Sequence, residues 1–392
     1  MTANSECARD TRFVASAIVR HIAERAFQPL QIVDMLITED CNCRCDYCFV
    51  HGKRAKRMTE EIVKATIDFM LMRSREFAAP ELLFLGGEPL MAFDLIQLAV
   101  DYGKWQAKRR RKTIKYSMTT NGTLLDEEKL RFFRDNGINL LLSLDGDEAT
   151  HNAHRKFADG RGTYDTVASM IPLMKQYQPW LGARVTPTPE NLNKMAANVE
   201  HLHSLGINQF IIGPASGLEY SDEDVLEYKR QLRKLLDFYI VQRKAKAHLK
   251  IGMFEKELDS APGSKRGVWG CSAGRTRISV SASGEIQPCA KVQGLNDLAG
   301  IPEYSLGNVL TGFRNFDARR EFISFDAAAR KACHPCCLQC DCAGGCPAVN
   351  YQYSKSIHIP DPNECKMLWA YMEVKAEAFA RLEAEGLLSA AA

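Results

Sequence analysis

The sequence lacks any long apolar run. None of its 392 residues lies in an uninterrupted apolar stretch near the ~18 residues that a membrane-spanning helix needs. The segment from Met1 to Phe27 mixes charged with apolar residues and lacks the apolar core of a signal peptide. We therefore expect a cytoplasmic protein with no membrane partner.

An excess of charge of either sign is also missing. The chain carries 51 Lys and Arg against 48 Asp and Glu, a net charge of +3, whereas proteins that bind nucleic acid usually carry a strong basic excess. Nucleic acid is therefore not an expected partner. A hydrophobic share of 46% and a charged share of 25% are typical of a globular protein.

Cysteine is absent over a long central stretch, between Cys48 and Cys271. Of the 14 cysteines, one is Cys7, four lie within Cys41–Cys48 and nine lie within Cys271–Cys365. In a reducing cytosol, cysteines grouped in this way favour metal or redox chemistry over a disulfide framework. The distribution predicts two separate metal regions.

Between residue 31 and about residue 250, short apolar runs alternate with longer amphipathic ones. The predicted strands are Ile32–Ile37, Leu82–Leu85, Thr113–Met118, Leu140–Leu144, Ala183–Thr186 and Phe210–Ile212. The predicted helices are Thr59–Arg73, Asp94–Lys108, Asp126–Asp135, Tyr164–Gln176, Leu192–Leu205 and Asp222–Lys244. Because buried strands that alternate with helices are typical of parallel sheets, the pattern predicts an α/β fold built as an open or closed barrel.

Polar and glycine-rich motifs follow the first four predicted strands. They are Cys41–Cys48, Gly86-Gly87-Glu88, Thr120-Asn121-Gly122 and Asp145-Gly146. Because functional groups in parallel α/β folds lie in the loops after the strand C-termini, we expect the four motifs to share one rim. Asn-Gly and Asp-Gly are also ordinary turn formers, so Asp145 is interpreted as a turn residue or as support for the site.

From about Pro262 onward the sequence becomes rich in Cys, Gly and Pro. Residues 276–288, with Ser283-Gly284 at their centre, are predicted to form a small hairpin. The apolar spacing after Cys365 predicts a closing helix that runs to about Leu388.

The spacing Cys41-x3-Cys45-x2-Cys48 places three thiols in one short loop. Three thiolates can hold three irons of a cubane and leave the fourth iron open to a small molecule. A structural zinc site is the alternative, but it would need a fourth protein ligand. Cys43 does not fit the triplet and is interpreted as a non-ligand.

This triplet, with Tyr47 before its last cysteine and Gly86-Gly87-Glu88-Pro89 further on, resembles the signature of the radical S-adenosylmethionine (SAM) superfamily over roughly residues 30–250. The resemblance implies a partial (β/α)6 TIM-like barrel. It also implies that Cys41, Cys45 and Cys48 hold a [4Fe–4S] cluster whose open iron is chelated by SAM. In that family, electron transfer from the cluster cleaves SAM and releases a 5′-deoxyadenosyl radical.

The same resemblance implies further SAM contacts. Gly86, Gly87 and Glu88 match the motif that receives the SAM amino group, where glycine permits close backbone approach and a carboxylate accepts charge-assisted hydrogen bonds. The other matches are Tyr47, then Ser143 and Arg184 for the ribose or carboxylate, then Ile211 and Ile212 for the adenine. The alternatives are a salt bridge inside the barrel mouth for Arg184 and a satisfied strand-end hydroxyl for Ser143.

The distal cysteines resemble the seven-cysteine pattern of the SPASM domain, an auxiliary-cluster extension of radical SAM enzymes that act largely on peptides and proteins. The resemblance implies a C-terminal Cys-rich auxiliary-cluster domain with two [4Fe–4S] clusters. The first would be held by Cys271, Cys289 and Cys346, and the second by Cys333, Cys336, Cys342 and Cys365. A zinc ribbon is the alternative, because Cys-x2-Cys spacing also suits zinc.

The first auxiliary cluster lacks a fourth cysteine. The family often supplies one just upstream of the Cys271 position, but this chain has none between Cys48 and Cys271. We expect an open iron or a non-cysteine ligand. Cys337 and Cys340 are unassigned and could substitute.

The expected organisation is an N-terminal helical segment at 1–30, a radical SAM barrel at 31–260, a SPASM domain at 265–370 and a C-terminal helix at 371–392. Only about 30 residues precede the first predicted strand. These are too few for the winged-helix domain with which many peptide-modifying relatives grip a leader. A separate leader-recognition protein, a direct contact by the N-terminal segment and leader-independent binding all stay open.

The leading hypothesis is a radical SAM/SPASM peptide maturase. The deoxyadenosyl radical would remove a hydrogen atom from a ribosomally synthesised precursor peptide, and the product would be crosslinked or oxidatively modified. The expected partners are that peptide and a reductant such as flavodoxin or ferredoxin.

Three alternatives stay open: formylglycine formation in sulfatases, small-molecule or cofactor biosynthesis, and a ferredoxin-like electron carrier or metal-binding regulator. Formylglycine-forming relatives commonly place an aspartate that acts as base after the Cys289 position, whereas this chain has Ala290 followed by Lys291. A carrier, in turn, has no use for the Gly86-Gly87-Glu88 motif.

Overall fold

The computed structural model describes residues 28–50, 53–75, 77–255, 271–299, 304–325, 330–338, 342 and 344–388. The expected N-terminal helical segment falls almost entirely on residues 1–27, which lie outside the described residues, as do Cys7 and Cys340. None of the helices in the described ranges combines the length and the apolar composition that a membrane crossing requires.

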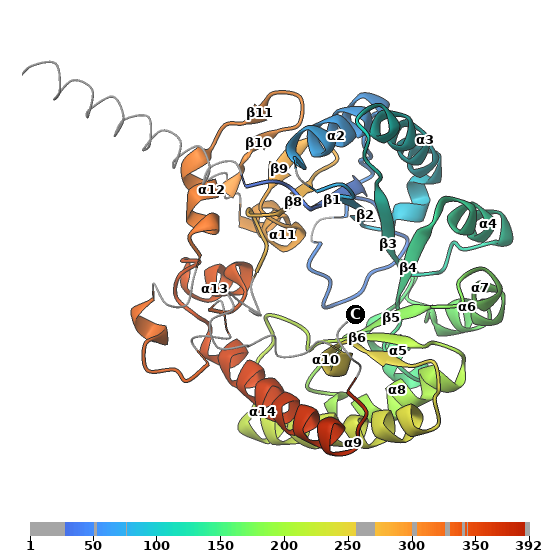
Figure 1. The fold of residues 1–392 in the computed structure, drawn as a ribbon, viewed down its shortest axis with the longest axis vertical. Helices are drawn as coiled ribbons and strands as arrows, with labels where there is room; N and C mark the ends of the chain where they lie inside the picture. Colours follow the sequence, from blue (N-terminus) through green and yellow to red (C-terminus); the bar gives the residue numbers. More distant parts are fainter. Residues whose placement is uncertain are drawn as a thin grey trace, which may run out of the picture.

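Six parallel strands form the wall of an open barrel, which confirms the predicted fold class. They are β1 (Ile32–Thr38), β2 (Glu81–Gly86), β3 (Lys115–Thr120), β4 (Ile138–Ser143), β5 (Gly182–Val185) and β6 (Gln209–Ile212). Each pairs in parallel with the next along the chain, and a short β7 (Lys250–Ile251) follows β6. Because every connection passes through a helix, the carboxyl ends of the strands meet at one rim (Figure 1).

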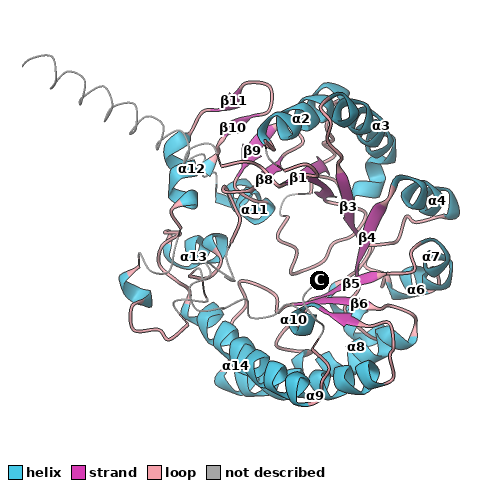
Figure 2. Ribbon diagram, viewed as in Figure 1, coloured by secondary structure: helices cyan, strands magenta, loops and turns pink. Residues whose placement is uncertain are grey.

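Helices cover the outside of this wall (Figure 2). They include α2 (Glu60–Arg73), α3 (Phe93–Arg109), α4 (Glu127–Asn136), α8 (Met195–Ser204) and α9 (Asp222–Lys244). The register partners Met35, Phe84 and Met118 form one row across β1, β2 and β3, and all three are fully buried. Apolar rows of this kind hold the sheet in the core, while the loops at its carboxyl end stay available for chemistry.

The single helix predicted at Tyr164–Gln176 is wrong. The structure has two short helices there, α6 (Tyr164–Ala168) and α7 (Ile171–Tyr177). Pro172 stands in the first turn of α7, and a proline lacks the N–H that a continuous helix would need at this place.

Two further elements also differ from the sequence-based expectation. The sequence did not predict α5 (Glu148–His154), which is capped by Asp147, whose side chain accepts a hydrogen bond from the Thr150 N–H. The predicted helix Leu192–Leu205 begins with a turn of 3-10 helix, η2 (Leu192–Lys194), before α8. A similar turn, η1 (Pro89–Ala92), precedes α3.

The C-terminal region continues the same sheet. The predicted hairpin is present as β8 (Arg277–Val280) and β9 (Glu285–Gln287), and β8 also pairs in parallel with β1. With β10 (Gly307–Asn308) and β11 (Gly312–Phe313), the sheet has eleven strands in the order β11-β10-β9-β8-β1-β2-β3-β4-β5-β6-β7. The C-terminal region is therefore joined to the first strand of the barrel by backbone hydrogen bonds.

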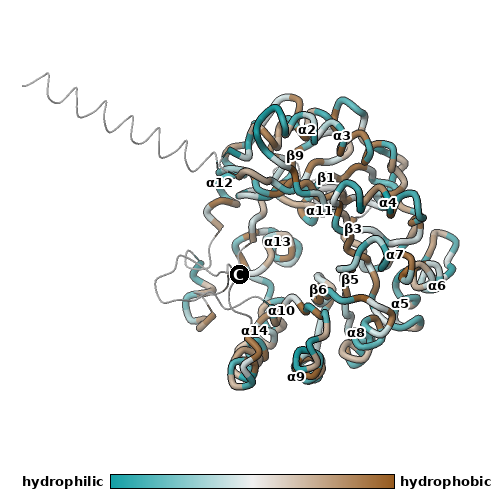
Figure 3. The backbone as a smooth tube through the Cα atoms, turned by 45° about the vertical axis from the view of Figure 1, so that its right-hand side comes forward, coloured by the Kyte–Doolittle hydropathy of each residue, from teal (hydrophilic) through white to brown (hydrophobic). Residues whose placement is uncertain are grey.

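The closing helix α14 (Pro362–Ala384) joins this region to the opposite edge of the barrel. It begins before residue 371, with Asp361 accepting the Asn363 N–H at its N-terminus, and it ends before Leu388. Figures 1 and 3 both show α14 beside α9, and the ion pairs Lys229–Glu373 (2.6 Å) and Arg233–Glu377 (2.7 Å) connect the two helices. The other helices in the described part of the chain are α10 (Gly252–Glu255), α11 (Ala290–Ala299), α12 (Phe316–Ile323), η5 (Lys331–Cys333) and α13 (Pro347–Ser354).

An ion pair between a buried carboxylate and a partly exposed arginine fastens β8 to β1. Arg277 donates through Nε and Nη2 to the two carboxylate oxygens of Asp34, at 2.8 and 2.7 Å. Asp34 is 1% exposed, so its charge depends on this partner. Burial raises the pKa of Asp34, and the guanidinium of Arg277 opposes that rise.

Replacing Arg277 with alanine should destabilise the chain by about 3 to 5 kcal/mol, because the Asp34 carboxylate would stay buried without its partner. The midpoint of urea unfolding measures the change. Arg320→Ala is the matched control: its pair with Asp317 is exposed and should contribute no more than about 1 kcal/mol. Equal destabilisation by the two substitutions would contradict the role given to the Asp34–Arg277 pair.

Candidate active site

The turn after β2 lies directly against the start of the cysteine loop. The Gly87 N–H donates to the Thr38 carbonyl at 2.9 Å, and the Glu88 N–H donates to the Asp40 carbonyl at 2.8 Å. A Cβ on Gly86 would lie 2.2 Å from the Thr38 oxygen, and one on Gly87 would lie 2.0 Å from the Asp40 oxygen. Glycine is required at both positions because two backbone segments touch there.

Glu88 connects the end of β2 to the end of β3. Its side chain is 1% exposed. Oε1 accepts hydrogen bonds from the Leu90 N–H (3.1 Å) and the Thr120 hydroxyl (2.7 Å), and Oε2 accepts one from the Asn121 N–H (2.7 Å). Burial raises the pKa of Glu88 to about 7, although these three hydrogen bonds lower it.

Cys41, Cys45 and Cys48 lie in one loop above this turn. The Cys41 N–H donates to Asp40 Oδ1 at 2.8 Å, and the Cys48 N–H donates to the Cys45 carbonyl at 3.4 Å. Cys41 is buried, whereas Cys45 and Cys48 are partly exposed. The three predicted ligands are therefore brought together by one backbone turn.

Neighbouring groups favour the thiolate of Cys41. A hydrogen bond from the Cys43 side chain lowers the pKa of Cys41 to about 6 against the effect of burial, and Lys53 and Arg44 lower it further. For Cys45, burial raises the pKa, and Lys53 again acts in the opposite direction. Positively charged side chains thus lie near Cys41 and Cys45.

Cys43 has a different environment from the triplet. It is 2% exposed, its backbone forms a bridge with Phe157, and its thiol accepts a hydrogen bond from Asn121 Nδ2 at 3.2 Å. Its role as a non-ligand stays a prediction.

Tyr47 belongs to a buried network under the loop. Its hydroxyl donates to Asp145, and Asp145 also pairs with Arg155 at 2.8 and 3.2 Å and accepts the Thr186 N–H at 3.0 Å. Burial would raise the pKa of Asp145, but the charge of Arg155 holds it below its usual range. Asp145 therefore supports the loop as an ionised carboxylate, which is one of the two interpretations drawn from the sequence.

Ser143, Arg184 and Ile211 are register partners across β4, β5 and β6. The Ser143 hydroxyl and the Arg184 guanidinium make no hydrogen bond or ion pair with any residue that the structure describes. Burial lowers the pKa of Arg184, and Asp145 partly offsets this effect. Ile212, the register partner of Val185 on β5, packs against the core.

The C-terminal cysteines form two groups. Cys271, Cys289 and Cys346 pack together against a small apolar cluster that contains Phe322 and Ala348. Burial raises the pKa of Cys289 to about 12, with Cys271 and Cys346 contributing to the rise. The three thiols predicted for the first auxiliary cluster are therefore neighbours.

The second group contains the other four predicted ligands. Burial raises the pKa of Cys365 to about 12, and Cys342, Cys333 and Cys336 add to the rise because they lie close by. Cys337 is exposed, and Cys340 lies outside the described residues. The side chain of Glu364 lies between the two groups, because it precedes Cys365 and accepts the Cys346 N–H at 3.2 Å.

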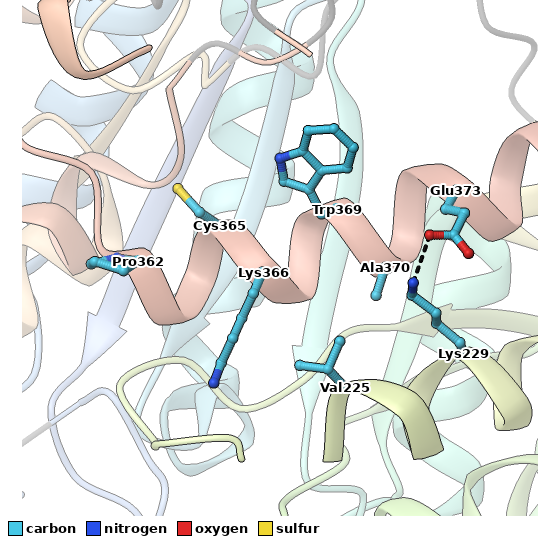
Figure 4. Close-up of a pocket in the computed structure, with 8 residues that line it drawn as sticks. All are labelled: Val225, Lys229, Pro362, Cys365, Lys366, Trp369, Ala370 and Glu373. Atoms are coloured by element: carbon cyan, nitrogen blue, oxygen red, sulfur yellow. Dashed lines mark hydrogen bonds and ion pairs between the residues drawn. The ribbon is translucent and has the colours of Figure 1, made fainter. Parts of the chain in front are cut away.

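A cavity of about 530 Å³ opens beside Cys365, between α9 and α14. Figure 4 shows Cys365 and Trp369 extending from the same side of α14, with Lys229 reaching Glu373 from α9. The cavity is lined by Val225, Lys229, Pro362, Cys365, Lys366, Trp369, Ala370 and Glu373. The second cysteine group thus lies close to the outer surface.

Helix α11 connects the two cysteine regions. A Cβ on Gly294 would lie 2.1 Å from the Phe49 carbonyl oxygen, so the backbone of α11 touches the residue that follows Cys48. Cys289 immediately precedes α11, five residues before Gly294. The loop of the first triplet and the first C-terminal group are therefore in direct structural contact.

Two groups at this site, Arg155 and Lys53, were not predicted from the sequence. Arg155 directly follows α5, which was not predicted. Lys53 donates to Cys48 Sγ at 3.0 Å. A signal for Lys53 was present, because it begins a basic run of Lys53, Arg54, Lys56 and Arg57 just after the triplet.

Gly87→Ala should displace the cysteine loop, because the added Cβ would overlap the Asp40 carbonyl. After anaerobic reconstitution we expect the variant to bind ~4 fewer irons per chain than the native protein, with an unchanged circular dichroism spectrum. Gly252→Ala is the control, since a Cβ there would meet the Phe210 oxygen at an ordinary 3.5 Å. Full iron content in the Gly87 variant would refute the assigned contact.

Comparison with known proteins gives consistent results. A family model described as the radical SAM superfamily matches residues 35–232. The chain is 25% identical to the cysteine-type anaerobic sulfatase-maturating enzyme of Clostridium perfringens over 340 residues, which are 81% of this chain and 89% of that protein.

Solved structures share the fold. Native anSMEcpe with bound AdoMet and Cp18Cys peptide matches with a TM-score of 0.73 at 22% identity, over 90% of this chain and 98% of that one. SuiB of Streptococcus suis bound to the precursor peptide SuiA matches with a TM-score of 0.62 at 18% identity, over 91% and 81% of the two chains. Because the family model spans just over half of the 392 residues, the chain belongs to the radical SAM superfamily and is an enzyme that uses SAM and a [4Fe–4S] cluster.

Proposed function

We propose that this radical SAM enzyme modifies a peptide and carries two auxiliary iron–sulfur clusters in its C-terminal region. The observation that carries the proposal is the grouping of seven distal cysteines into a set of three and a set of four, with the set of three in contact with the first triplet through α11. A radical enzyme that only cleaved SAM would have no need for these two sets of cysteines.

The loop residues fit a [4Fe–4S] cluster held by Cys41, Cys45 and Cys48. Among the described residues, no three His, Cys, Asp or Glu side chains gather around one ion-sized position. In a [4Fe–4S] cubane each thiolate binds a different iron, so the three thiols do not need to surround a single ion-sized position. The nearby carboxylates are already engaged, since Asp46 pairs with His154 and Asp145 with Arg155.

When bound, the cluster and SAM supply a 5′-deoxyadenosyl radical that removes a hydrogen atom from the substrate. Arg184 is suited to the SAM carboxylate, because its guanidinium is uncommitted and carboxylates prefer such bidentate donors. Glu88 fills three of its roughly four acceptor positions within the protein and keeps one for the SAM amino group. Since the Tyr47 hydroxyl is bound to Asp145, its contact with SAM would come from the ring or backbone.

In this proposal, Cys271, Cys289 and Cys346 hold the first auxiliary cluster. Cys333, Cys336, Cys342 and Cys365 hold the second. The first keeps an iron without a cysteine ligand, which suits it to bind a reacting group of the substrate. An auxiliary cluster would accept the electron that a crosslinked or oxidised product must lose.

A peptide substrate is supported by the solved structures of anSMEcpe and SuiB, which were obtained with peptides bound. A low-potential protein donor, such as flavodoxin or ferredoxin, would supply the electron for SAM cleavage. A separate leader-recognition protein is a further proposed partner.

Formylglycine formation is a second candidate, and it is favoured by the match to a sulfatase-maturating enzyme. The position after Cys289 argues against it. Ala290 is buried and offers no base, and the side chain of Lys291 donates to the Ser216 hydroxyl at 2.6 Å.

Cys45→Ala should abolish formation of 5′-deoxyadenosine from SAM in the presence of dithionite, because the cluster would lose one of its three thiolates. Cys43→Ala, its matched control, should retain most of this activity. The native chain is expected to bind ~12 irons, and the Cys45 variant ~8. Liquid chromatography and iron analysis measure the two quantities. Absence of 5′-deoxyadenosine from fully loaded native protein would refute the proposed function.

The native chain should not form an aldehyde on a cysteine-containing sulfatase peptide, because no carboxylate base follows Cys289. Hydrazide labelling and mass spectrometry of the peptide provide the measurement. A labelled peptide would reverse the order of the two candidate functions.

A further inference from the structure

Lys53 has no part in the function proposed above, yet its ammonium lies against the first cysteine triplet. Lys53 Nζ donates to Cys48 Sγ at 3.0 Å in a partly buried position. No ion pair joins Lys53 to a carboxylate of any described residue. Its positive charge therefore faces the thiols and not an acidic side chain.

The neighbouring basic residues are arranged differently. Arg54, Lys56 and Arg57 are exposed, Lys56 lies 3.8 Å from Glu39, and Arg57 pairs with Asp94. Arg44 turns to the backbone and donates to the carbonyls of Cys41 and Cys43. Among the described basic residues of this run, only Lys53 donates a hydrogen bond to a thiol.

We propose that Lys53 is a positioning residue that tunes the SAM-binding cluster, because its ammonium donates a hydrogen bond to the Cys48 sulfur and makes the cluster easier to reduce. The inference deepens the proposed function and rests on Cys48 being a cluster ligand.

The physical reason is the change in charge on reduction. One electron passes from an external low-potential donor to the cluster, and no atom is transferred. The reduced cluster places more negative charge on its sulfurs, so a cationic donor at 3.0 Å stabilises it more than the oxidised cluster. Hydrogen bonds to the sulfurs are among the factors that set the reduction potentials of such clusters.

This arrangement suits a reaction that begins with a difficult reduction. SAM cleavage needs an electron from the reduced cluster, so a lower potential would leave fewer molecules ready to react with a given donor. Lys53 acts on this step through the cluster and does not touch the substrate.

The test compares Lys53→Met with the native protein in an anaerobic redox titration with dithionite, followed by electron paramagnetic resonance. The SAM-binding cluster is identified as the signal that changes shape when SAM is added. At a fixed potential we expect the ratio of reduced to oxidised cluster to fall at least tenfold, which equals 59 mV for a one-electron couple. Lys53→Arg should restore most of the native ratio, because it keeps both the charge and the donor.

Lys56→Met is the matched control, since it removes an equal charge three residues away without removing a hydrogen bond to sulfur. It should leave the ratio within twofold of native. An equal fall in both variants, or no fall in Lys53→Met at full iron content, would overturn the inference. If Lys53→Met does not hold the cluster, Lys53→Gln replaces it, and a native-like ratio in that variant would show that the charge of Lys53 has no effect.

Failure of the premise that Cys41, Cys45 and Cys48 hold the SAM-binding cluster gives a different result. In that case the native protein would show no signal that responds to SAM. A SAM-responsive signal with an unchanged potential in the lysine variants would instead leave the function standing and remove the role of Lys53.

Discussion

The contact between two backbone segments, at Gly86 and Gly87, determines how the site is built. The segment that enters the cysteine loop lies so close to the turn after β2 that a side chain at either glycine would overlap a carbonyl oxygen. The loop is therefore positioned by main-chain hydrogen bonds from Gly87 and Glu88. Glu88 extends the constraint to β3 through Thr120 and Asn121. Three strand ends are thus fixed together, and they position the loop that carries the thiols.

The C-terminal region depends on anchors at both edges of the open barrel. At one edge β8 adds to β1, and the Asp34–Arg277 pair reinforces that contact. At the other edge α14 lies beside α9 (Figure 1), and both helices carry fully buried residues, such as Leu235 in α9 and Val374 in α14. The partly exposed ion pairs between these helices contribute little by comparison. The two cysteine groups are consequently held between fixed points, and the helix that follows Cys289 touches the loop of the first triplet.

Sequence predicted the parts of this structure that depend on local patterns. The six barrel strands could be predicted because they are short apolar or alternating segments bounded by turn residues, and the hairpin of β8 and β9 because a glycine turn lies at its centre. The pairing of β8 with β1 could not be predicted, since it joins segments that are far apart in the chain and neither carries a local signal for the other.

At the site too, residues in local motifs could be predicted, whereas residues placed by contacts between distant segments could not. The cysteine triplet and the glycine turn are local motifs, whereas the grouping of the distal cysteines was expected only through the resemblance to a known domain. Arg155 was missed because α5 is a polar helix of two turns, whose formation depends on the cap at Asp147 and on tertiary contacts and not on an apolar stripe. The single helix predicted at Tyr164–Gln176 ignored Pro172, which breaks it.

The polar network under the loop also explains why Arg184 remains available. A salt bridge inside the barrel mouth was the alternative for this residue, and Asp145 is close enough to affect its pKa. Asp145, however, already binds Arg155 with both oxygens and accepts hydrogen bonds from Tyr47 and the Thr186 N–H. Because Arg155 already neutralises the charge of Asp145, this carboxylate forms no ion pair with Arg184. The Arg184 guanidinium, on the row of Ser143, therefore stays uncommitted among the described residues, and its proposed role as partner of the SAM carboxylate rests on this property.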